Sequence, residues 1–278
     1  MGETWKVGVI GLGIMGRRML EHMGRHPAFE VVAAWDPSAE ACAAAARIGP
    51  GMIVGSAEAA IEAADVVYLA CPPAPRKTYA LAAAAQGKAV FLEKPFGVDV
   101  GESRDLAARL AASGVPAAVN FTQAAGEALA SVLDDGARGE DRGIDIVVTY
   151  PHWPRAWQVE ADWLRFAAEG GYVREVISHF LFFSARVLGP LRLVWARPTW
   201  PADPALCETH VAARLENSAG VPVSVFGSVG GVQPDRQEVT VTGSARSWRI
   251  SDFYRTAVSD GGPFEAAGEE PEDPRATS

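Results

Sequence analysis

The feature of this chain that most constrains its fold is a regular alternation of two patterns over the first 122 residues. Short runs rich in Val, Ile and Leu alternate with alanine-rich stretches that favour helix. Strands that are apolar along their whole length are buried on both faces, and the intervening helices supply that cover. The apolar runs lie at Lys6–Ile10, Glu30–Trp35, Asp65–Ala70, Ala89–Leu92 and Pro116–Val119, and the helical stretches at Met15–Arg25, Ala39–Arg47, Arg76–Gln86 and Ser103–Ala112. The alternation predicts a doubly wound parallel sheet of the Rossmann type.

The second half of the chain, after about Phe121, has a different pattern of apolar and polar residues. A short helix is expected at Gly126–Asp135 and a longer one at Gly171–Leu188, with a strand at Ile144–Tyr150 and an irregular aromatic stretch between them. The remainder alternates apolar and polar residues, which is typical of an antiparallel sheet with one covered face. Its strands are expected at Leu191–Arg197, Cys207–Glu216, Pro222–Val229, Glu238–Thr242 and Ser247–Ile250.

Together the two patterns predict an α/β chain of two domains. Residues 1–122 form a dinucleotide-binding Rossmann domain, and residues 123–267 form an α+β domain with a mostly antiparallel sheet for substrate and subunit contacts. Residues 268–278 are rich in proline and acidic side chains and are expected to be disordered. A length of 278 residues is sufficient for two domains that each bury a core.

The charge and the cysteines limit the partners and compartments to consider. The net charge is -9 and there is no run of Lys or Arg, which argues against binding nucleic acid. The three cysteines form no CxxC pair and no histidine lies beside one, so we predict neither a disulfide framework nor a metal site. No secretory signal is visible, and the longest apolar stretch, 176–188, contains His179 and Arg186. We expect a cytoplasmic protein without membrane contact.

A glycine motif follows the first apolar run and opens the first helix. It reads Gly11-Leu12-Gly13-Ile14-Met15-Gly16. In this context Gly11 permits a tight turn, Gly13 lets a pyrophosphate approach the helix N-terminus, and Gly16 packs the helix on the strand. Asp36 ends the second run, where a carboxylate accepts from both ribose hydroxyls of NAD and repels the 2′-phosphate of NADP. We predict a dinucleotide site that prefers NAD, with NADP as the alternative; a flavodoxin-like turn without a ligand is the structural alternative.

A second motif, Glu93-Lys94-Pro95, directly follows the fourth apolar run. Ligands of open parallel sheets bind beyond the carboxyl ends of the strands, so Lys94 is expected near the nicotinamide end of a dinucleotide. Pro95 ends the hydrogen bonding of the strand and fixes the backbone around the lysine. Without this position in the sheet, a solvated surface lysine would be the better interpretation.

The two motifs together resemble the Gfo/Idh/MocA family of glucose–fructose oxidoreductase-like and inositol-dehydrogenase-like enzymes. The resemblance covers essentially the whole first domain. It implies that Lys94 contacts substrate and nicotinamide and moves the proton at the reacting oxygen. It also implies cofactor contacts for Cys71, Pro72 and Glu93. The matching stretches are Val9–Gly16, Asp36-Pro37, Ala85–Lys88 with Val90, and Glu93–Gly97.

The second domain carries a third match, the segment Gly170–His179. The family commonly has Gly-Gly and then Asp-x-x-x-His on a helix that faces the active site. Positions i and i+4 share a helix face, so Glu175 can orient the His179 imidazole while His179 and Lys94 share the acid/base task. The alternative is a buried histidine that has only a structural role.

Three departures from the family pattern weaken any transfer of a specific substrate. Glu175 stands where the family usually has Asp, which places the carboxylate one methylene further out. Arg76 stands where a histidine is common. We expect the late helix and returning strand of the family to be missing after Phe264.

Two further residues are candidates for substrate contact. Asn120 ends the last strand of the first domain, and Trp163 precedes the Gly-Gly segment. A tryptophan can form a pocket wall on which a sugar ring stacks, although core or subunit packing is the better interpretation for most of the tryptophans between 153 and 200.

These features predict an NAD(P)-dependent dehydrogenase or reductase. It transfers a hydride between nicotinamide and a carbonyl or hydroxyl carbon of a small polar, sugar- or polyol-like substrate. One alternative is reduction of a C=N bond in a biosynthetic pathway, and another is a sensor that binds NAD(H) without turnover. The resemblance also implies a homodimer or homotetramer.

Overall fold

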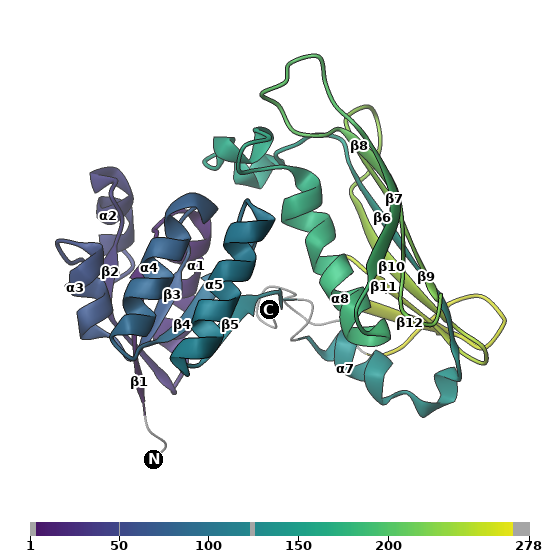
Figure 1. The fold of residues 1–278 in the computed structure, drawn as a ribbon, viewed down its shortest axis with the longest axis horizontal. Helices are drawn as coiled ribbons and strands as arrows, with labels where there is room; N and C mark the ends of the chain where they lie inside the picture. The colour runs from purple at the N-terminus through teal and green to yellow at the C-terminus, as the bar shows by residue number, and fades with distance from the viewer. Residues whose placement is uncertain (1–3, 50, 123–125, 269–278) are drawn as a thin grey trace. The chain divides into compact units, whose positions relative to one another are not determined.

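The computed structural model describes residues 4–49, 51–122 and 126–268 (Figure 1). Their contacts divide the chain into two compact units, and the division falls between Asn120 and Phe121. Of the tail predicted at 268–278, all but Gly268 lies outside the described residues. Each unit is described below by itself.

The described part of the first unit contains a parallel five-stranded sheet in the order β2-β1-β3-β4-β5. Serine and aspartate side chains cap α2, α3 and α5, where they accept from main-chain N–H groups of the first turn. The strands are β1 (Trp5–Ile10), β2 (Phe29–Trp35), β3 (Val66–Leu69), β4 (Ala89–Glu93) and β5 (Ala117–Asn120). The helices are α1 (Ile14–Arg25), α2 (Ala39–Ala46), α3 (Ala57–Ala63), α4 (Pro73–Ala85) and α5 (Val100–Ser113).

Helices cover both faces of this sheet (Figure 1), and its central strands β1, β3 and β4 are mostly buried. Val7 and Val9 of β1 pack with Leu20 of α1 on one face. Ile10 of β1 packs on the other face with residues of α3, α4 and α5, among them Ile61. The doubly wound arrangement predicted from the apolar runs is therefore confirmed.

The second unit is built on a sheet of eight strands within the described residues, in the order β13-β12-β11-β10-β6-β9-β8-β7. The pair β6·β9 is parallel and the other pairs are antiparallel, which confirms the predicted mostly antiparallel sheet. The strands are β6 (Asp141–Tyr150), β7 (Arg192–Thr199), β8 (His210–Glu216), β9 (Pro222–Val229), β10 (Arg236–Gly243), β11 (Ser247–Ser251), β12 (Arg255–Ser259) and β13 (Glu265–Ala266).

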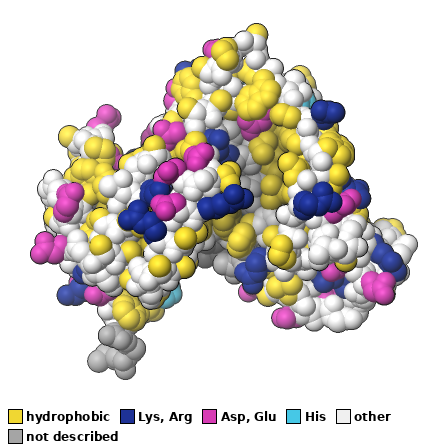
Figure 2. Space-filling view, viewed as in Figure 1, with side chains coloured by type: hydrophobic (Ala, Val, Ile, Leu, Met, Phe, Trp, Pro, Cys, Tyr) yellow, Lys and Arg dark blue, Asp and Glu magenta, His cyan; other side chains and the backbone are white. Residues whose placement is uncertain are grey.

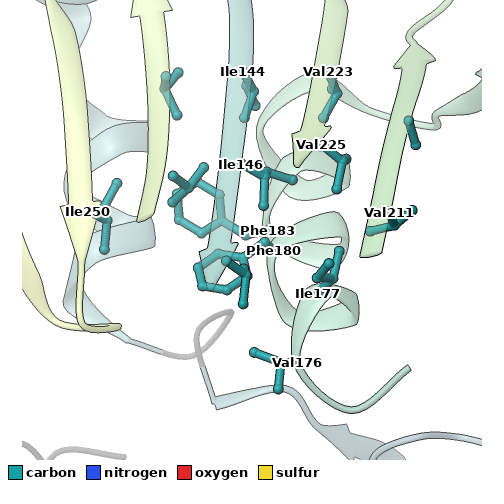
Figure 3. Packing of buried hydrophobic residues seen from close by; sticks show 14 of the residues in the cluster. Ile144, Ile146, Val176, Ile177, Phe180, Phe183, Val211, Val223, Val225 and Ile250 are labelled. Atoms are coloured by element: carbon teal, nitrogen blue, oxygen red, sulfur yellow. The ribbon is translucent and has the colours of Figure 1, made fainter. Parts of the chain in front are cut away.

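One face of this second sheet is covered by helix. Phe180 and Phe183 of α8 (Ser178–Leu188) pack against inward side chains such as Ile146 and Val225 (Figure 3). Val223 and Val225 point into this core while the Phe226 side chain is half exposed on the other side, as the period of two requires. The short helix α7 (Glu127–Asp134) adds Leu129 to the same core.

The structure contains elements that the sequence patterns did not predict. Helix α3 and strands β12 and β13 were missed, and the expected helix at Gly171–Leu188 begins with a π-helix over Val173–Ile177. The irregular stretch at 151–170 contains two short 3-10 turns, Ala156–Gln158 and Asp162–Arg165. Within the described ranges, no helix has both the length and the apolar character that crossing a membrane requires.

Candidate active site

The glycine motif forms the turn between β1 and α1. Gly11 has φ +96°, and a Cβ there would lie 2.3 Å from the Cys71 main-chain nitrogen. A Cβ at Gly16 would lie 1.9 Å from the Gly11 carbonyl oxygen. Among the described residues, by contrast, a Cβ at Gly13 would meet no atom within 4 Å, and no side chain caps the N-terminus of α1 that follows it. Two glycines are thus required by close packing, while the third leaves the helix N-terminus, with Ile14 and Met15, open to an anion.

Asp36 holds this turn against the end of β2. One carboxylate oxygen, Oδ2, accepts from the Leu12 main-chain N–H at 2.8 Å, and Oδ1 accepts from Ser38 N–H at 2.8 Å. Each oxygen retains a further lone pair, so the carboxylate can still accept from ribose hydroxyls. An open helix N-terminus beside a fixed carboxylate fits a dinucleotide, with pyrophosphate on the first and ribose on the second.

The other predicted residues of the first unit lie at the same edge of its sheet. In the parallel pairings Glu93 of β4 is opposite Asn120 of β5, and Leu92 is opposite Leu69, two residues before Cys71. Pro72 is the N-cap of α4. Lys94 is half-buried and follows β4 directly, and its peptide bond to Pro95 is cis. The carboxyl ends of the parallel strands therefore bring together the candidate cofactor residues of this unit.

A buried hydrogen-bond network lies beside Lys94. The Glu93 side chain is 3% exposed, and its Oε1 accepts from the Tyr68 hydroxyl and, at 2.7 Å, from Asn120 Nδ2. Burial raises the pKa of Tyr68 well above its usual range, and the negative charge of Glu93 adds to the effect. Asn120, predicted as a substrate contact, thus uses its amide to hold Glu93.

Sequence reasoning missed two residues of this network. Tyr68 lies in an apolar strand run, where only its hydroxyl distinguishes it from a core residue, and Arg76 appeared only as a departure from the family pattern. The structure buries Arg76 with its guanidinium against main-chain carbonyls. The available signal for Arg76 was a charged residue at the start of an alanine-rich helix. It was missed because a surface position is the default interpretation for arginine.

Cys71 is buried at the end of β3. Burial raises the pKa of its thiol, so the thiol stays protonated near neutral pH and is a poor nucleophile. Cys71 is therefore suited to contact a cofactor through its main chain and its small apolar side chain.

In the second unit, Glu175 and His179 lie on successive turns of one continuous helical segment. Glu175 belongs to the π-helix Val173–Ile177, and His179 to the first turn of α8; their side chains are 4% and 7% exposed. The rings of Phe121 and Phe253 approach the imidazole edge-on, with centroid distances of 5.7 and 6.2 Å. A π-turn is rare and recurs at functional sites.

Glu208 fixes the start of this helical segment. Gly171 has φ +108°, and both oxygens of the Glu208 carboxylate would lie 3.1 Å from a Cβ placed on Gly171. Its Oε1 accepts from the Val173 main-chain N–H at 2.9 Å. A carboxylate on the first N–H groups of a helix satisfies donors that have no partner within the helix. A side chain at position 171 would crowd the Glu208 carboxylate and would be strained at this φ.

The predicted pocket residue Trp163 is half-buried in the 3-10 turn Asp162–Arg165. Its neighbour Trp153 donates from Nε1 to the Leu164 carbonyl at 3.0 Å and packs on the core of the second unit. Trp195 and Trp200 are about half exposed. Within the described residues, no group of three or more His, Cys, Asp or Glu side chains could hold a metal ion.

The first unit resembles known proteins in its sequence. Residues 5–121 match the model of the Gfo/Idh/MocA family, described as "Oxidoreductase family, NAD-binding Rossmann fold". A curated relative, inositol 2-dehydrogenase of Cereibacter sphaeroides (strain ATCC 17023), is 38% identical over 106 residues, which are 36% of this chain and 31% of the relative. The match thus spans about a third of the relative's length.

Solved structures resemble the chain over both units. GenD2 from gentamicin A biosynthesis, solved in complex with NAD, has a TM-score of 0.79 and 21% identity over 90% of this chain and 73% of its own. KijD10, a 3-ketoreductase from Actinomadura kijaniata solved with NADP and TDP-benzene, has a TM-score of 0.80 and 21% identity over 95% and 84%. At this level of identity the likeness shows the fold alone and indicates no substrate.

Proposed function

We propose that this chain is an NAD(P)-dependent dehydrogenase or reductase that acts on a carbonyl or hydroxyl carbon of a small polar, sugar- or polyol-like substrate. The observation that carries the proposal is that the open glycine turn, Asp36 and Lys94 follow the carboxyl ends of β1, β2 and β4 in one parallel sheet. The similarity to inositol 2-dehydrogenase supports the substrate class. A bound nicotinamide supplies the hydride acceptor or donor.

In this proposal the protein's own part in the reaction is the movement of a proton. In the oxidation direction Lys94 takes the proton from the substrate hydroxyl as its carbon loses hydride, and in reduction it returns the proton to the carbonyl oxygen. His179 is the second acid/base group, and Glu175 is the carboxylate that orients it. The family resemblance and the burial of both side chains support these two roles.

We propose NAD as the preferred cofactor. The Asp36 carboxylate is fixed by two main-chain N–H groups, so it cannot turn away from a ribose 2′-phosphate without losing both hydrogen bonds. A charged acceptor suits the 2′-hydroxyl of NAD and repels the phosphate of NADP.

A panel of substrates tests the proposed reaction. The purified chain is assayed by nicotinamide absorbance with myo-inositol, UDP-N-acetylglucosamine and free hexoses in the oxidation direction, and with cyclic imines in the reduction direction. Turnover of a polyol or sugar supports the proposal. Turnover of imines alone supports C=N reduction instead, and tight NADH binding with no turnover of any compound supports a sensor.

We further propose that the chain acts in the cytoplasm as a homodimer or homotetramer. All three cysteines are free thiols, as expected in a reducing compartment. Large apolar side chains are exposed on the second sheet, including Leu193, Trp195 and Phe226, and Figure 2 shows exposed hydrophobic side chains among charged ones on the face in view. Light scattering of the purified chain tests the oligomeric state, and a monomer at micromolar concentration would contradict it.

A further inference from the structure

Arg76 is a buried arginine whose guanidinium donates to three main-chain carbonyls in the first unit. It lies in the first turn of α4, is 2% exposed, and donates from Nη1 to the Glu93 carbonyl at 2.6 Å and to the Pro95 carbonyl. From Nη2 it donates to the Cys71 carbonyl. One guanidinium thus links the end of β3 to the turn after β4.

The two acceptors of Nη1 lie on either side of Lys94. Glu93 is the residue before the lysine and Pro95 the residue after it, so the guanidinium fixes the direction of both carbonyls that flank this side chain. The Glu93 side chain is independently held by Tyr68 and Asn120. The main chain around Lys94 is therefore constrained from two sides.

A buried guanidinium is an expensive way to connect two strands. Moving a charged group out of water costs free energy unless it is fully hydrogen-bonded or paired, and apolar residues of similar volume often serve stability as well or better. What arginine adds is geometry, because its planar fork binds several acceptors in fixed directions, whereas a lysine is a point charge. The free-energy cost of burying Arg76 is explained if the direction of the Lys94 turn matters for the reaction.

We propose that Arg76 is a positioning residue for Lys94, acting through the Glu93 and Pro95 carbonyls. This inference rests on the proposed function, in which Lys94 moves the proton. Arg76 sets the direction in which the lysine side chain leaves the backbone. Its hydrogen bond to the Cys71 carbonyl connects this turn to the end of β3, on which the glycine turn packs. The histidine common at this position in the family has fewer donors and cannot bond all three carbonyls at once.

Three substitutions separate positioning from a purely structural role. Arg76→Lys keeps the charge without the fork, Arg76→Gln keeps two donors without the charge, and Arg76→Met keeps only the volume. Arg138→Lys is the matched control: this partly buried arginine donates to the Val132 carbonyl at 2.7 Å and pairs with Asp141 at 3.0 Å, both in the second unit.

The first readout is the split between kcat and dinucleotide affinity, measured with whichever panel substrate turns over. We expect Arg76→Lys to lower kcat about 10-fold to 100-fold, as a small misplacement of a reacting group does, with an unchanged Kd for NADH. Arg138→Lys is expected to lower Tm and leave kcat unchanged. Equal kcat in wild type, Arg76→Lys and Arg76→Gln would overturn the proposal, as would a failure of all three Arg76 variants to fold.

The second readout needs neither substrate nor cofactor. The chain has only four lysines, Lys6, Lys77, Lys88 and Lys94. Acetylation by a limiting amount of an amine-reactive reagent can therefore be followed at each lysine by peptide mass spectrometry. We expect the Lys94 rate relative to Lys88 to rise several-fold in the Arg76 variants, because a half-buried amine becomes more accessible when its turn is released. An unchanged ratio in folded variants would overturn the proposal.

Lys94→Met, assayed in parallel, distinguishes failure of this inference from failure of the proposed function. Unchanged kcat in Lys94→Met contradicts the catalytic role of Lys94 whatever Arg76 does. A large loss in Lys94→Met together with unaltered Arg76 variants contradicts only the positioning role.

Discussion

The two segments that carry the proposed acid/base groups are supported in opposite ways. Around Lys94 the support is polar: Arg76 binds the flanking carbonyls, and Tyr68 and Asn120 hold the Glu93 carboxylate. Around His179 the support is aromatic, with the rings of Phe121 and Phe253 edge-on to the imidazole. The first unit therefore orients a flexible side chain through its backbone, whereas the second orients a rigid ring by direct contact.

This difference follows from the side chains themselves. A lysine has a flexible four-carbon stem and carries its charge at the tip, so packing against its amine would desolvate the group that must hold a proton. An imidazole is a flat ring with a partly apolar surface, and edge-to-face contacts restrict it without removing its ring nitrogens from use. The same positioning task thus uses polar donors in one unit and apolar rings in the other.

The largest effect should come from removing the two supported groups themselves. Lys94→Met is expected to lower kcat by about 10²-fold to 10⁴-fold, the usual contribution of a positioned acid or base. His179→Gln should lower kcat less, because Lys94 still carries the proton. Steady-state kinetics with NADH binding as the control checks both. A larger loss in His179→Gln than in Lys94→Met would reverse the proposed order of the two groups.

The next effect should be on the polar support. Asn120→Ala removes a donor from the buried Glu93 carboxylate and is expected to lower the free energy of unfolding by about 1–3 kcal/mol. It should also lower kcat without changing KM for the dinucleotide. Urea denaturation and kinetics of the same preparation measure the two quantities. Loss of stability with unaltered kcat would mean that the network supports the fold but not the Lys94 turn.

The aromatic support should be less costly to break. Phe253 stacks on Phe180 with a centroid distance of 5.4 Å and is held at φ +69°, in the left-handed region. Phe253→Leu is expected to lower the free energy of unfolding by about 1 kcal/mol through the lost ring contacts. Its kcat should fall by less than that of Asn120→Ala, since Phe121 still contacts His179. Thermal unfolding and kinetics check this, and a greater kcat loss than in Asn120→Ala would contradict the comparison.

The smallest effect concerns alkaline pH and the three buried tyrosines. The pKa values of Tyr68, Tyr150 and Tyr172 are all raised by burial. Their neutral forms are therefore favoured in the folded state, and the stability they contribute is present below the unfolded pKa of about 10 and lost as pH rises above it. Tyr68→Phe should make the decline in Tm above that pH shallower. An unchanged slope would show that Tyr68 does not titrate with unfolding.

The first unit was the more predictable from sequence because its signals are local. A strand, a Gly-x-Gly-x-x-Gly turn and a helix follow one another within a short stretch, and Gly11 and Gly16 are required by close contacts of that turn itself. Helix α3 was missed because its seven residues, Ala57–Ala63, include only one large apolar side chain, Ile61, too few to show a helical period. Its Ser56 cap was the signal that was present.

Long-range polar contacts were beyond the reach of these patterns. Tyr68, Arg76, Glu93 and Asn120 come from three strands and a helix, and periodicity says nothing about which hydroxyl meets which carboxylate. The π-turn at Val173–Ile177 was also invisible, because the apolar spacing of the segment is that of an ordinary helix. Glu208 was expected in a strand, alternating with His210 and able to face a pocket, whereas its carboxylate binds a helix start 35 positions away.

The most direct test of the account is a fluorescence titration of the folded chain with NADH and, separately, with NADPH. The account predicts saturable binding of NADH, weaker binding of NADPH, and loss of both in Gly13→Glu, which places a carboxylate at the open N-terminus of α1. Preference for NADPH would contradict only the role given to Asp36. Binding of neither dinucleotide by a chain shown to be folded would contradict the central claim.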